Sequence, residues 1–383
     1  MMSRRALLTT GTASVVLFGL GGTWWATTGP ARSAREPWST ATEGFGDPRL
    51  DVLAYAILAP NPHNMQPWQI ALGEGGEFTV FCDLDRLLPE TDPPNRQITI
   101  GFGCFLELVR QSAAEFGLRA DISYFPEGEP WPLLDRRPVV HVELVEDLSV
   151  RPDPLFSSVL DRRTNRLPFD TSRQVDTGAL AELQAGKVDG VEILATADAA
   201  FVDELRTLTT DAWGVEWDTA STRRESIEVM RIGKAEVDAK PYGLSIDDRL
   251  TSTIGLLGLM SPEALDNPKS SAYRESFKFY ERACASAMAF VWSTTPSNTR
   301  RAQLEAGRAW VRTQLLANAL GLSFHPLSQA LQEFPEMAEH YKRAHELLSS
   351  NGGDTVQMLA RLGYASSVGP APRQALESKL LPV

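Results

Sequence analysis

The sequence predicts an α+β protein built from two tandem halves, residues 46–152 and 153–383. Segments with apolar residues at three-to-four spacing, typical of helices, alternate along the chain with short apolar segments typical of strands. This succession starts again after Pro152-Asp153-Pro154, and no low-complexity linker separates the two parts. We therefore expect the two halves to pack closely against each other.

The first half is predicted to contain a helix over 49–58, a hairpin over 69–72 and 77–83, a helix over 98–116 and a strand near 139–144. The first helix stops at Pro60 because proline cannot continue a helix and favours an extended conformation in the residue before it. The four residues 73–76, three of them glycines, favour the tight turn of the hairpin. Gly117 is a suitable C-cap for the second helix.

The second half is predicted to contain helices over 155–162, 180–184, 199–213 and 304–320, and strands over 191–196 and 290–294. The helix over 304–320 has the clearest apolar face and ends at Gly321. Residues 217–247 contain many acidic and many basic side chains. This segment is therefore either a solvated excursion, that is, a loop exposed to solvent, or a lid over a site.

The N-terminal residues 1–34 form an expected export signal rather than part of the fold. Arg4 and Arg5 precede a short apolar stretch, residues 13–20, and small residues follow at 29–34. The paired arginines resemble a twin-arginine signal, which directs folded proteins for export, although an ordinary secretory signal is the alternative. The expected location is the periplasm or cell envelope, and an uncleaved segment would bring the chain into contact with the membrane.

Composition and motif searches exclude several function classes. The 383 residues carry a formal charge of −12, which argues against a nucleic-acid binder. The three scattered cysteines form neither a disulfide scaffold nor a C-x-x-C site, and the five histidines lack the spacing of metal ligands. The sequence contains no Walker motif and no G-x-S-x-G motif.

Two segments carry the candidate chemistry. Residues 60–68, Pro-Asn-Pro-His-Asn-Met-Gln-Pro-Trp, place side-chain amides between prolines, which suits recognition of a planar polar ring. A stiff connection with incidental amides is the alternative. Residues 161–169 contain Arg162, Arg163 and Arg166 with Thr164 between them, which suits a phosphate, although a solvated basic turn would look the same.

These two segments resemble the flavin-contacting motifs of the nitroreductase family. Two further stretches agree in order, Gly307-Arg308-Ala309-Trp310 with the Pro326-Leu327-Ser328-Gln329 that follows it, and the C-terminal Arg361-Leu362-Gly363-Tyr364 with Arg373. Together with the twin-arginine start and the doubled length, they resemble the Acg branch of FMN-binding nitroreductase-like oxidoreductases.

The resemblance implies a nitroreductase-like fold in which the halves form an intramolecular pseudo-dimer with a lid-like insertion. Ordinary nitroreductases are homodimers, and each FMN site takes the arginine segment from one subunit and the Asn-x-Gln-Pro-Trp loop from the other. Here the loop occurs only in the first half and the arginine segment only in the second. The chain is therefore expected to hold one composite FMN site and to need no second copy.

The resemblance also implies individual roles. Arg162 and Arg166 would contact the FMN phosphate or the pyrimidine edge, with Thr164, where the family usually has serine, as a hydroxyl partner. Arg373 would be a second phosphate ligand, and the backbone at 327–328 would approach the reactive edge of the ring. The expected cofactor-binding residues are Pro60, Asn61, Pro62, Asn64, Gln66, Arg162, Thr164, Arg166, Leu327, Ser328 and Arg373, with no metal ligand and no catalytic residue assigned.

The expected activity is reduction of a small-molecule electron acceptor, such as a nitro compound or quinone, by NAD(P)H through FMN. A second hypothesis is a flavin-binding or flavin-sequestering protein with little reductase activity, because a lid over 217–247 would exclude substrates. A third hypothesis is an exported binding protein without flavin.

Overall fold

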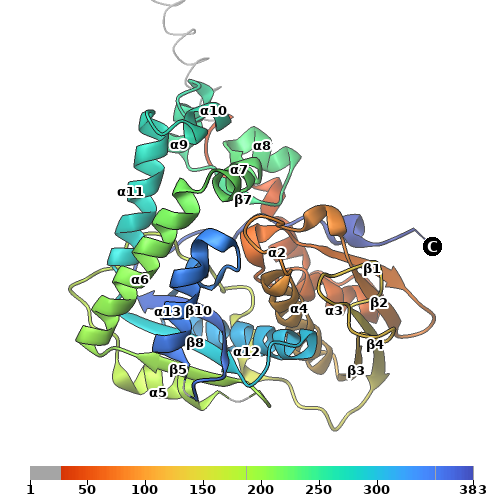
Figure 1. The fold of residues 1–383 in the computed structure, drawn as a ribbon. Helices are drawn as coiled ribbons and strands as arrows, with labels where there is room; N and C mark the ends of the chain where they lie inside the picture. Colours follow the sequence, from red (N-terminus) through yellow and green to blue (C-terminus); the bar gives the residue numbers. More distant parts are fainter. Residues whose placement is uncertain (1–26, 187, 350, 383) are drawn as a thin grey trace, which may run out of the picture.

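The computed structural model describes residues 27–186, 188–349 and 351–382, in which two four-stranded sheets flank a central pair of long helices (Figure 1). The expected α+β class with two tandem halves is confirmed. The expected signal residues Arg4 and Arg5 and the apolar stretch 13–20 lie outside the described residues.

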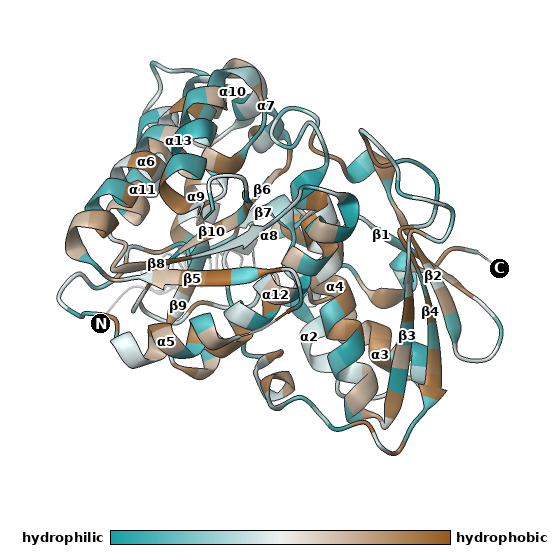
Figure 2. Ribbon diagram, turned by 60° about the horizontal axis from the view of Figure 1, so that its bottom comes forward, coloured by the Kyte–Doolittle hydropathy of each residue, from teal (hydrophilic) through white to brown (hydrophobic). Residues whose placement is uncertain are grey.

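The first half carries its sheet in the strand order β1-β2-β4-β3. Its elements are α3 (Pro48–Ala56), β1 (Trp68–Leu72), β2 (Glu77–Cys82), α4 (Arg96–Glu115), β3 (Leu118–Tyr124) and β4 (Val140–Glu146). All neighbouring strands are antiparallel. Hydrophobic and hydrophilic residues alternate along β3 and β4 (Figure 2), as expected for a sheet with one covered face.

The second half repeats this arrangement with the order β5-β8-β10-β9. Its elements are α5 (Thr177–Ala185), β5 (Glu192–Thr196), β8 (Ala289–Thr295), α12 (Arg300–Ala319), β9 (Ser323–Pro326), α13 (Ala338–Leu348) and β10 (Thr355–Gly363). In both halves a helix precedes the first strand, and a long helix joins the second strand to the third. The two halves therefore share one topology.

The two long helices α4 and α12 join the halves, and their backbones meet at two glycines. A Cβ atom on Gly103 would lie 2.0 Å from the carbonyl oxygen of Leu304, and one on Gly307 would lie 2.0 Å from that of Ile100. Only glycine allows such an approach. Beside it, Glu107 of α4 forms ion pairs with two arginines of α12.

A helical insertion separates β5 from β8, at the position where the first half has only the hairpin turn 73–76. It contains α6 (Ala199–Asp218), α7 (Ala220–Glu228), β6 (Met230–Ile232), α8 (Lys234–Ala239), β7 (Leu244–Ile246), α9 (Arg249–Leu256), α10 (Pro262–Asp266) and α11 (Ser271–Ala285). The insertion has its own small core around Trp213, Trp217 and Leu265. The segment 217–247 is thus folded rather than a solvated excursion, and it is only part of a larger unit.

Both ends of the described chain pack against parts of the molecule that are distant from them in the sequence. After β10 the chain returns to the first half, where Leu381 donates its N–H to the carbonyl oxygen of Ile70 at 2.7 Å, beside β1. At the N-terminal end, residues 31–41 form η1 (Ser33–Arg35) and α2 (Pro37–Thr40), with Ala31 and Ala34 buried. Residues 31–34, expected as the exit of the export signal, therefore belong to the packed structure.

Two elements differ from the expectation. Residues 155–162 form only the short 3-10 turn η4 (Pro154–Ser158), and the strand β3 was not predicted. The histidines His340 and His345 are half-buried on α13, where His345 Nε2 accepts the N–H of Val356.

None of the helices in the described part of the chain combines the length and apolar composition needed to cross a bilayer.

Candidate functional site

The loop after α3 has an unusual backbone, because three of its residues lie in the left-handed region. His63, Asn64 and Gln66 have φ values of 46°, 55° and 52°. This conformation costs roughly 1–2 kcal/mol for a residue with a side chain, so it persists only where surrounding contacts impose it. Asn61 supplies two of them: its Oδ1 accepts the N–H of Gln66 at 2.8 Å and its Nδ2 donates to Ala59 O at 3.0 Å.

Hydrogen bonds hold this loop against the insertion on one side and the C-terminal tail on the other. Gln66, fully buried, donates to Pro241 O at 2.9 Å and accepts the N–H of Gln374 at 2.9 Å. Asn64 donates to Pro372 O at 3.0 Å. Both amides, expected to contact a cofactor, are thus engaged in fixing the loop, while the outer face with Pro60 and Pro62 stays half-buried.

The arginine segment of the second half reaches the end of α3 in the first half. Arg162 is 3% exposed, donates from Nη2 to Leu58 O at 3.0 Å and from Nη1 to Gln314 Oε1 at 3.3 Å, and leaves its buried Nε without a partner. Burial lowers its pKa to about 10, so it remains charged at neutral pH. Thr164 Oγ1 faces the same amide, at 3.5 Å from Gln314 Nε2.

Three guanidinium groups converge at this end of the site without a carboxylate partner. Arg162, Arg163 and Arg373 lie 5.6, 5.1 and 5.5 Å from the centre of the Trp38 ring. None of the three forms an ion pair with any described residue. Burial lowers the pKa of Arg373 far below its usual value, and the charges of the two neighbouring arginines lower it further. An uncompensated cluster of this kind favours an anion.

Arg373 itself has a different role from the one expected. Its Nε donates to Ile57 O, its Nη2 to Leu58 O and Ala59 O, and its Nη1 to Asn64 Oδ1 and Pro372 O. All five N–H groups are therefore used. Arg373 thus satisfies the carbonyl groups of the three residues that directly follow α3, and in this geometry it is not free to bind a phosphate.

The other end of the site is formed around Arg166. This side chain is exposed and has no hydrogen bond or ion pair with the described residues, yet the surrounding protein removes enough water to lower its pKa. His63 of the loop is coupled electrostatically to Arg166. Its buried Nδ1 has no partner among the described residues, and its pKa is lowered to about 4, first by burial and then by the charge of Arg166.

Tyr280 and His325 line this end from the second half. The ring of Tyr280 lies 5.4 Å from that of His325, and its hydroxyl accepts a hydrogen bond from Gln329 Nε2 at 2.9 Å. His325 Nδ1 accepts from Arg361 Nε at 2.9 Å, and burial holds the pKa of His325 well below its usual value. Neither residue was predicted to be part of the site. Tyr280 belongs to the insertion, and only the fold brings it near Arg166.

The expected contribution of Leu327 and Ser328 is only partly compatible with the structure. Leu327 is fully buried and its N–H donates to Leu359 O at 2.9 Å, so this group is not available to a ligand. Ser328 is half-buried at the start of η5 (Gln329–Leu331) and stays a candidate.

Trp38 and the segment around it form a part of the site that sequence reasoning missed. Its indole Nε1 donates to Ala371 O at 2.8 Å, and Arg35 forms an ion pair with Asp247 of the insertion at 2.8 Å. The backbone of Arg373 donates to Ala34 O. The N-terminal segment therefore packs against the arginine cluster and connects it to the insertion. In the sequence, only the Trp-Ser-Thr stretch after the small residues could have indicated that this segment is part of the fold.

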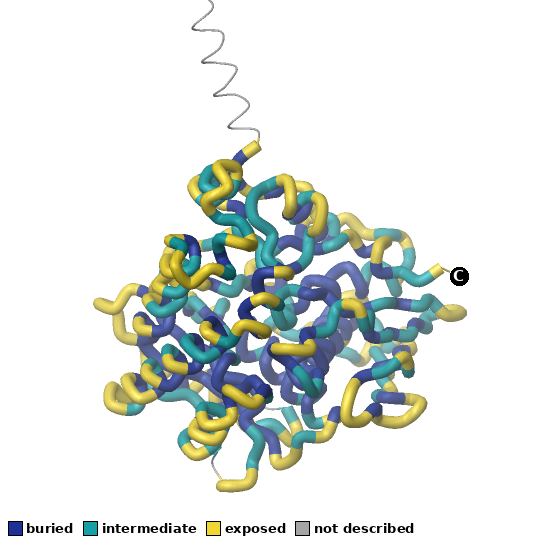
Figure 3. Tube along the Cα trace, turned by 45° about the horizontal axis from the view of Figure 1, so that its top comes forward, coloured by how far each residue is buried: buried dark blue, intermediate teal, exposed yellow. Residues whose placement is uncertain are grey.

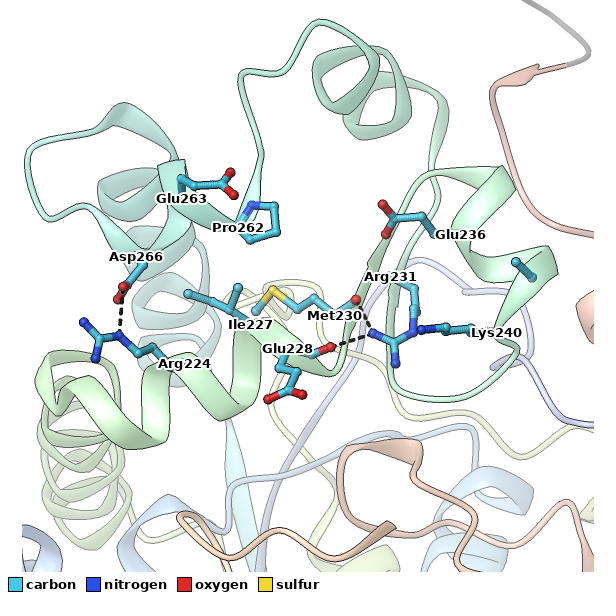
Figure 4. Close-up of a pocket in the computed structure, with 11 residues that line it drawn as sticks. Arg224, Ile227, Glu228, Met230, Arg231, Glu236, Lys240, Pro262, Glu263 and Asp266 are labelled. Atoms are coloured by element: carbon cyan, nitrogen blue, oxygen red, sulfur yellow. Dashed lines mark hydrogen bonds and ion pairs between the residues drawn. The ribbon is translucent and has the colours of Figure 1, made fainter. Parts of the chain in front are cut away.

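A separate cavity of about 680 Å³ lies within the insertion, and no expected site residue lines it (Figure 4). Its walls come from α7, β6, α8 and α10 and carry both charges. Arg224 pairs with Asp266 at 2.9 Å, and Arg231 donates to the carbonyl oxygens of Glu228 and Met230. In the described part of the chain, no cluster of three His, Cys, Asp or Glu side chains could hold a metal ion.

Comparison with known proteins relates the chain to nitroreductases. No family model matches it. It is 36% identical over 117 residues to the putative NAD(P)H nitroreductase acg of Mycobacterium tuberculosis, and 32% identical over 120 residues to the uncharacterized protein Rv3127 of the same organism. Each of these matches covers 30% of this chain and only about a third of the relative, 33% and 34% respectively. The putative NAD(P)H nitroreductase Rv3131, also from Mycobacterium tuberculosis, is 26% identical over 339 residues, 85% of this chain and 88% of that protein.

Among solved structures, a putative nitroreductase from Anabaena variabilis aligns over 86% of this chain and 91% of its own, with 11% identity and a TM-score of 0.49. The FMN-dependent nitroreductase NfnB of Mycobacterium smegmatis, in complex with NADPH, aligns over 57% of this chain and 92% of its own, with 15% identity and a TM-score of 0.35. Of the sequence matches above, the one to Rv3131 extends over most of the chain.

Proposed function

We propose that this protein is an FMN-dependent oxidoreductase of the nitroreductase type, with one flavin site shared by its two halves. The observation that carries the proposal is Arg162. This arginine of the second half is buried against the end of α3 in the first half and remains charged. Its Nε is unpartnered, and it forms no ion pair with a described residue. A buried cation with free donors needs an anionic partner, and a phosphate group meets that need.

The residues present fit FMN at both ends of the site. Arg162 and Arg163 would hold the phosphate, with Thr164 as a hydroxyl donor. The rigid outer face of the loop, with Pro60, Pro62 and the orphaned Nδ1 of His63, would line the ring. The names of the relatives agree with this proposal, because two of them are putative NAD(P)H nitroreductases.

When bound, FMN would accept a hydride from NAD(P)H and pass two electrons to an acceptor such as a nitro compound or quinone. Arg166, an exposed cation without an ion pair among the described residues, would offset negative charge that develops on the ring. His63 is neutral at neutral pH, so it can orient a ligand through a hydrogen bond but cannot deliver a proton as an imidazolium. Trp38 and the loop 241–243 would limit the access of water.

A flavin-sequestering protein with little turnover is the second candidate, and one observation favours it. The N-terminal segment and the insertion both close on the site, through Trp38 and through the contact of Gln66 with Pro241. Bleaching of bound flavin by NAD(P)H separates the candidates, because a sequestering protein would keep its oxidised spectrum.

Comparison of FMN with riboflavin tests the phosphate assignment directly. Riboflavin lacks the phosphate, so the protein freed of flavin should bind it at least tenfold more weakly than FMN in a fluorescence titration. Equal affinities would mean that the arginine cluster does not bind the phosphate.

We also propose export through the twin-arginine pathway, on the basis of Arg4 and Arg5 ahead of the apolar residues 13–20. Replacement of both arginines by lysine should leave the folded protein in the cytoplasm. Unchanged export of that variant would indicate the general secretory route.

A further inference from the structure

An exposed apolar surface lies at the end of the insertion, on α9 and the turn that follows it. Leu250, Leu256, Leu257 and Leu259 are 71%, 68%, 68% and 60% exposed. They lie within ten residues of one another, and we call residues 250–260 the leucine tip. Four large exposed apolar side chains so close together are unusual on a protein surface that faces only water, and they mark a contact with an apolar phase or partner.

The leucine tip lies beside the start of the described chain, where α9 and α10 form one extremity of the molecule (Figure 1). The side chain of Arg249 packs on Gly29, and its Nη1 donates to Thr28 O at 3.3 Å. The chain therefore enters the described structure beside the leucine tip. In the sequence, Trp24-Trp25 and the apolar stretch 13–20 precede this entry point.

The charge pattern of the leucine tip suits the boundary of a lipid bilayer. No Asp, Glu, Lys or Arg occurs from residue 250 to residue 262, so the tip can leave water without desolvating a charge. Charged residues return on both sides, at Asp247, Asp248 and Arg249 before it and at Glu263 after it. An uncharged apolar segment with charged residues on both sides is typical of a surface that enters the headgroup region of a membrane to a shallow depth.

The structure thus assigns a partner to this surface: we propose that the leucine tip lies in the interface of a lipid bilayer. The upstream apolar residues would bring this end of the molecule to the membrane, and the tip would fix the orientation of the folded body on it. In this orientation the insertion faces the bilayer, and the two sheets with the central helices lie further from it (Figure 1). Most of the buried chain, dark blue in Figure 3, is gathered in the middle of the molecule rather than at that end. The proposal does not depend on the identity of the cofactor.

The test places a fluorescent reporter at the leucine tip of the full chain. The native cysteines Cys82, Cys104 and Cys284 are all buried, and burial raises the pKa of each thiol, so an added surface cysteine should be labelled selectively. Leu257→Cys carries an environment-sensitive dye. Leu148→Cys is the matched control, because Leu148 is 91% exposed on the first half, away from the tip.

The labelled full chain is reconstituted into vesicles of phosphatidylethanolamine and phosphatidylglycerol, with and without a brominated lipid that quenches the dye. The expected result is a blue-shifted emission at position 257 that brominated lipid quenches at least twofold, with no such change at position 148. Unquenched emission at 257, from a chain that floats with the vesicles, would overturn the proposal, because the tip would then face water while the N-terminal segment alone holds the protein.

A second experiment distinguishes whether the leucine tip contacts a bilayer or another copy of the chain. Leu256→Glu with Leu257→Glu should lower the fraction of protein bound to vesicles at least threefold, whereas Leu148→Glu should leave it unchanged. Both substitutions lie at exposed positions and leave the buried core untouched. A blue shift at 257 that rises with protein concentration in the absence of lipid would instead show that a second copy covers the tip, and would overturn the proposal.

Discussion

Replacement of Arg162 by alanine removes the residue on which the composite site depends. Its guanidinium contributes one hydrogen bond to Leu58 O, one to Gln314 Oε1, and three N–H groups that the protein does not use. The first two hold the side chain in place between the halves, and the other three are available to an anion. We expect Arg162→Ala to weaken FMN binding strongly while the fold persists.

The size of the effect follows from the number of bonds available to a phosphate. A hydrogen bond to a charged group contributes about 1.5–3 kcal/mol, so the loss of a single such bond corresponds to a roughly 10- to 100-fold weaker affinity. Fold stability should change far less, because the variant loses two hydrogen bonds but also removes a buried charge whose desolvation is unfavourable.

Fluorescence titration with FMN measures the affinity, and thermal unfolding without flavin measures the fold. Arg173→Ala is the control, because Arg173 lies just after the arginine segment 161–169, is exposed, and stacks on Tyr364 at 3.6 Å, outside the arginine cluster. The control should bind FMN as the unmodified protein does. An unchanged affinity in Arg162→Ala, or an equal loss in both variants, would refute the assignment of the phosphate to this cluster.

Three further predictions address the interface, the buried acids and the N-terminal segment. Gly307→Ala should lower the unfolding free energy by about 1–3 kcal/mol in chemical denaturation, because its Cβ would lie 2.0 Å from a carbonyl oxygen of α4, whereas Gly353→Ala, in open space, should have little effect. Burial raises the pKa of Glu216 to about 7, so the native state binds its proton more tightly than the unfolded state does. Its stabilising contribution should be complete below about pH 4.5 and fall as pH rises through 7, and Glu216→Gln should remove this part of the pH dependence of stability. Arg35→Ala breaks the ion pair with Asp247 and should raise the dissociation rate of FMN, measured by dilution; an unchanged rate would show that the N-terminal segment does not close the site.

Helices and strands with strong local patterns were predictable from the sequence. The long helix α12 and the strand β8 lie close to the expected ranges because their apolar residues are continuous or strictly periodic. In contrast, β3 was missed because only alternate residues are partly buried, which leaves a weak apolar signal. The expected helix at 155–162 is a single 3-10 turn, because the arginine segment that follows is fixed by contacts to the other half rather than by local helix formation.

Site residues were predictable where a motif fixes them in one segment, and less so where the fold creates the environment. The loop 60–66 and the arginine segment were recognised from residue types and are brought together by the fold, with Arg162 beside Leu58. The role of Arg373 was not predictable, because its hydrogen bonds go to the end of a helix more than 300 residues earlier in the chain. Trp38 and Tyr280 were missed for the same reason: each reaches the site only through long-range packing.

The flavin content of the purified protein tests the central claim most directly. Denaturation of a known amount of chain, followed by chromatographic quantification of the released flavin, gives the number and identity of bound cofactors. Because the arginine segment and the loop each occur once, we predict one FMN per chain. No flavin after saturation with FMN, two equivalents per chain, or FAD in place of FMN would contradict a single composite FMN site.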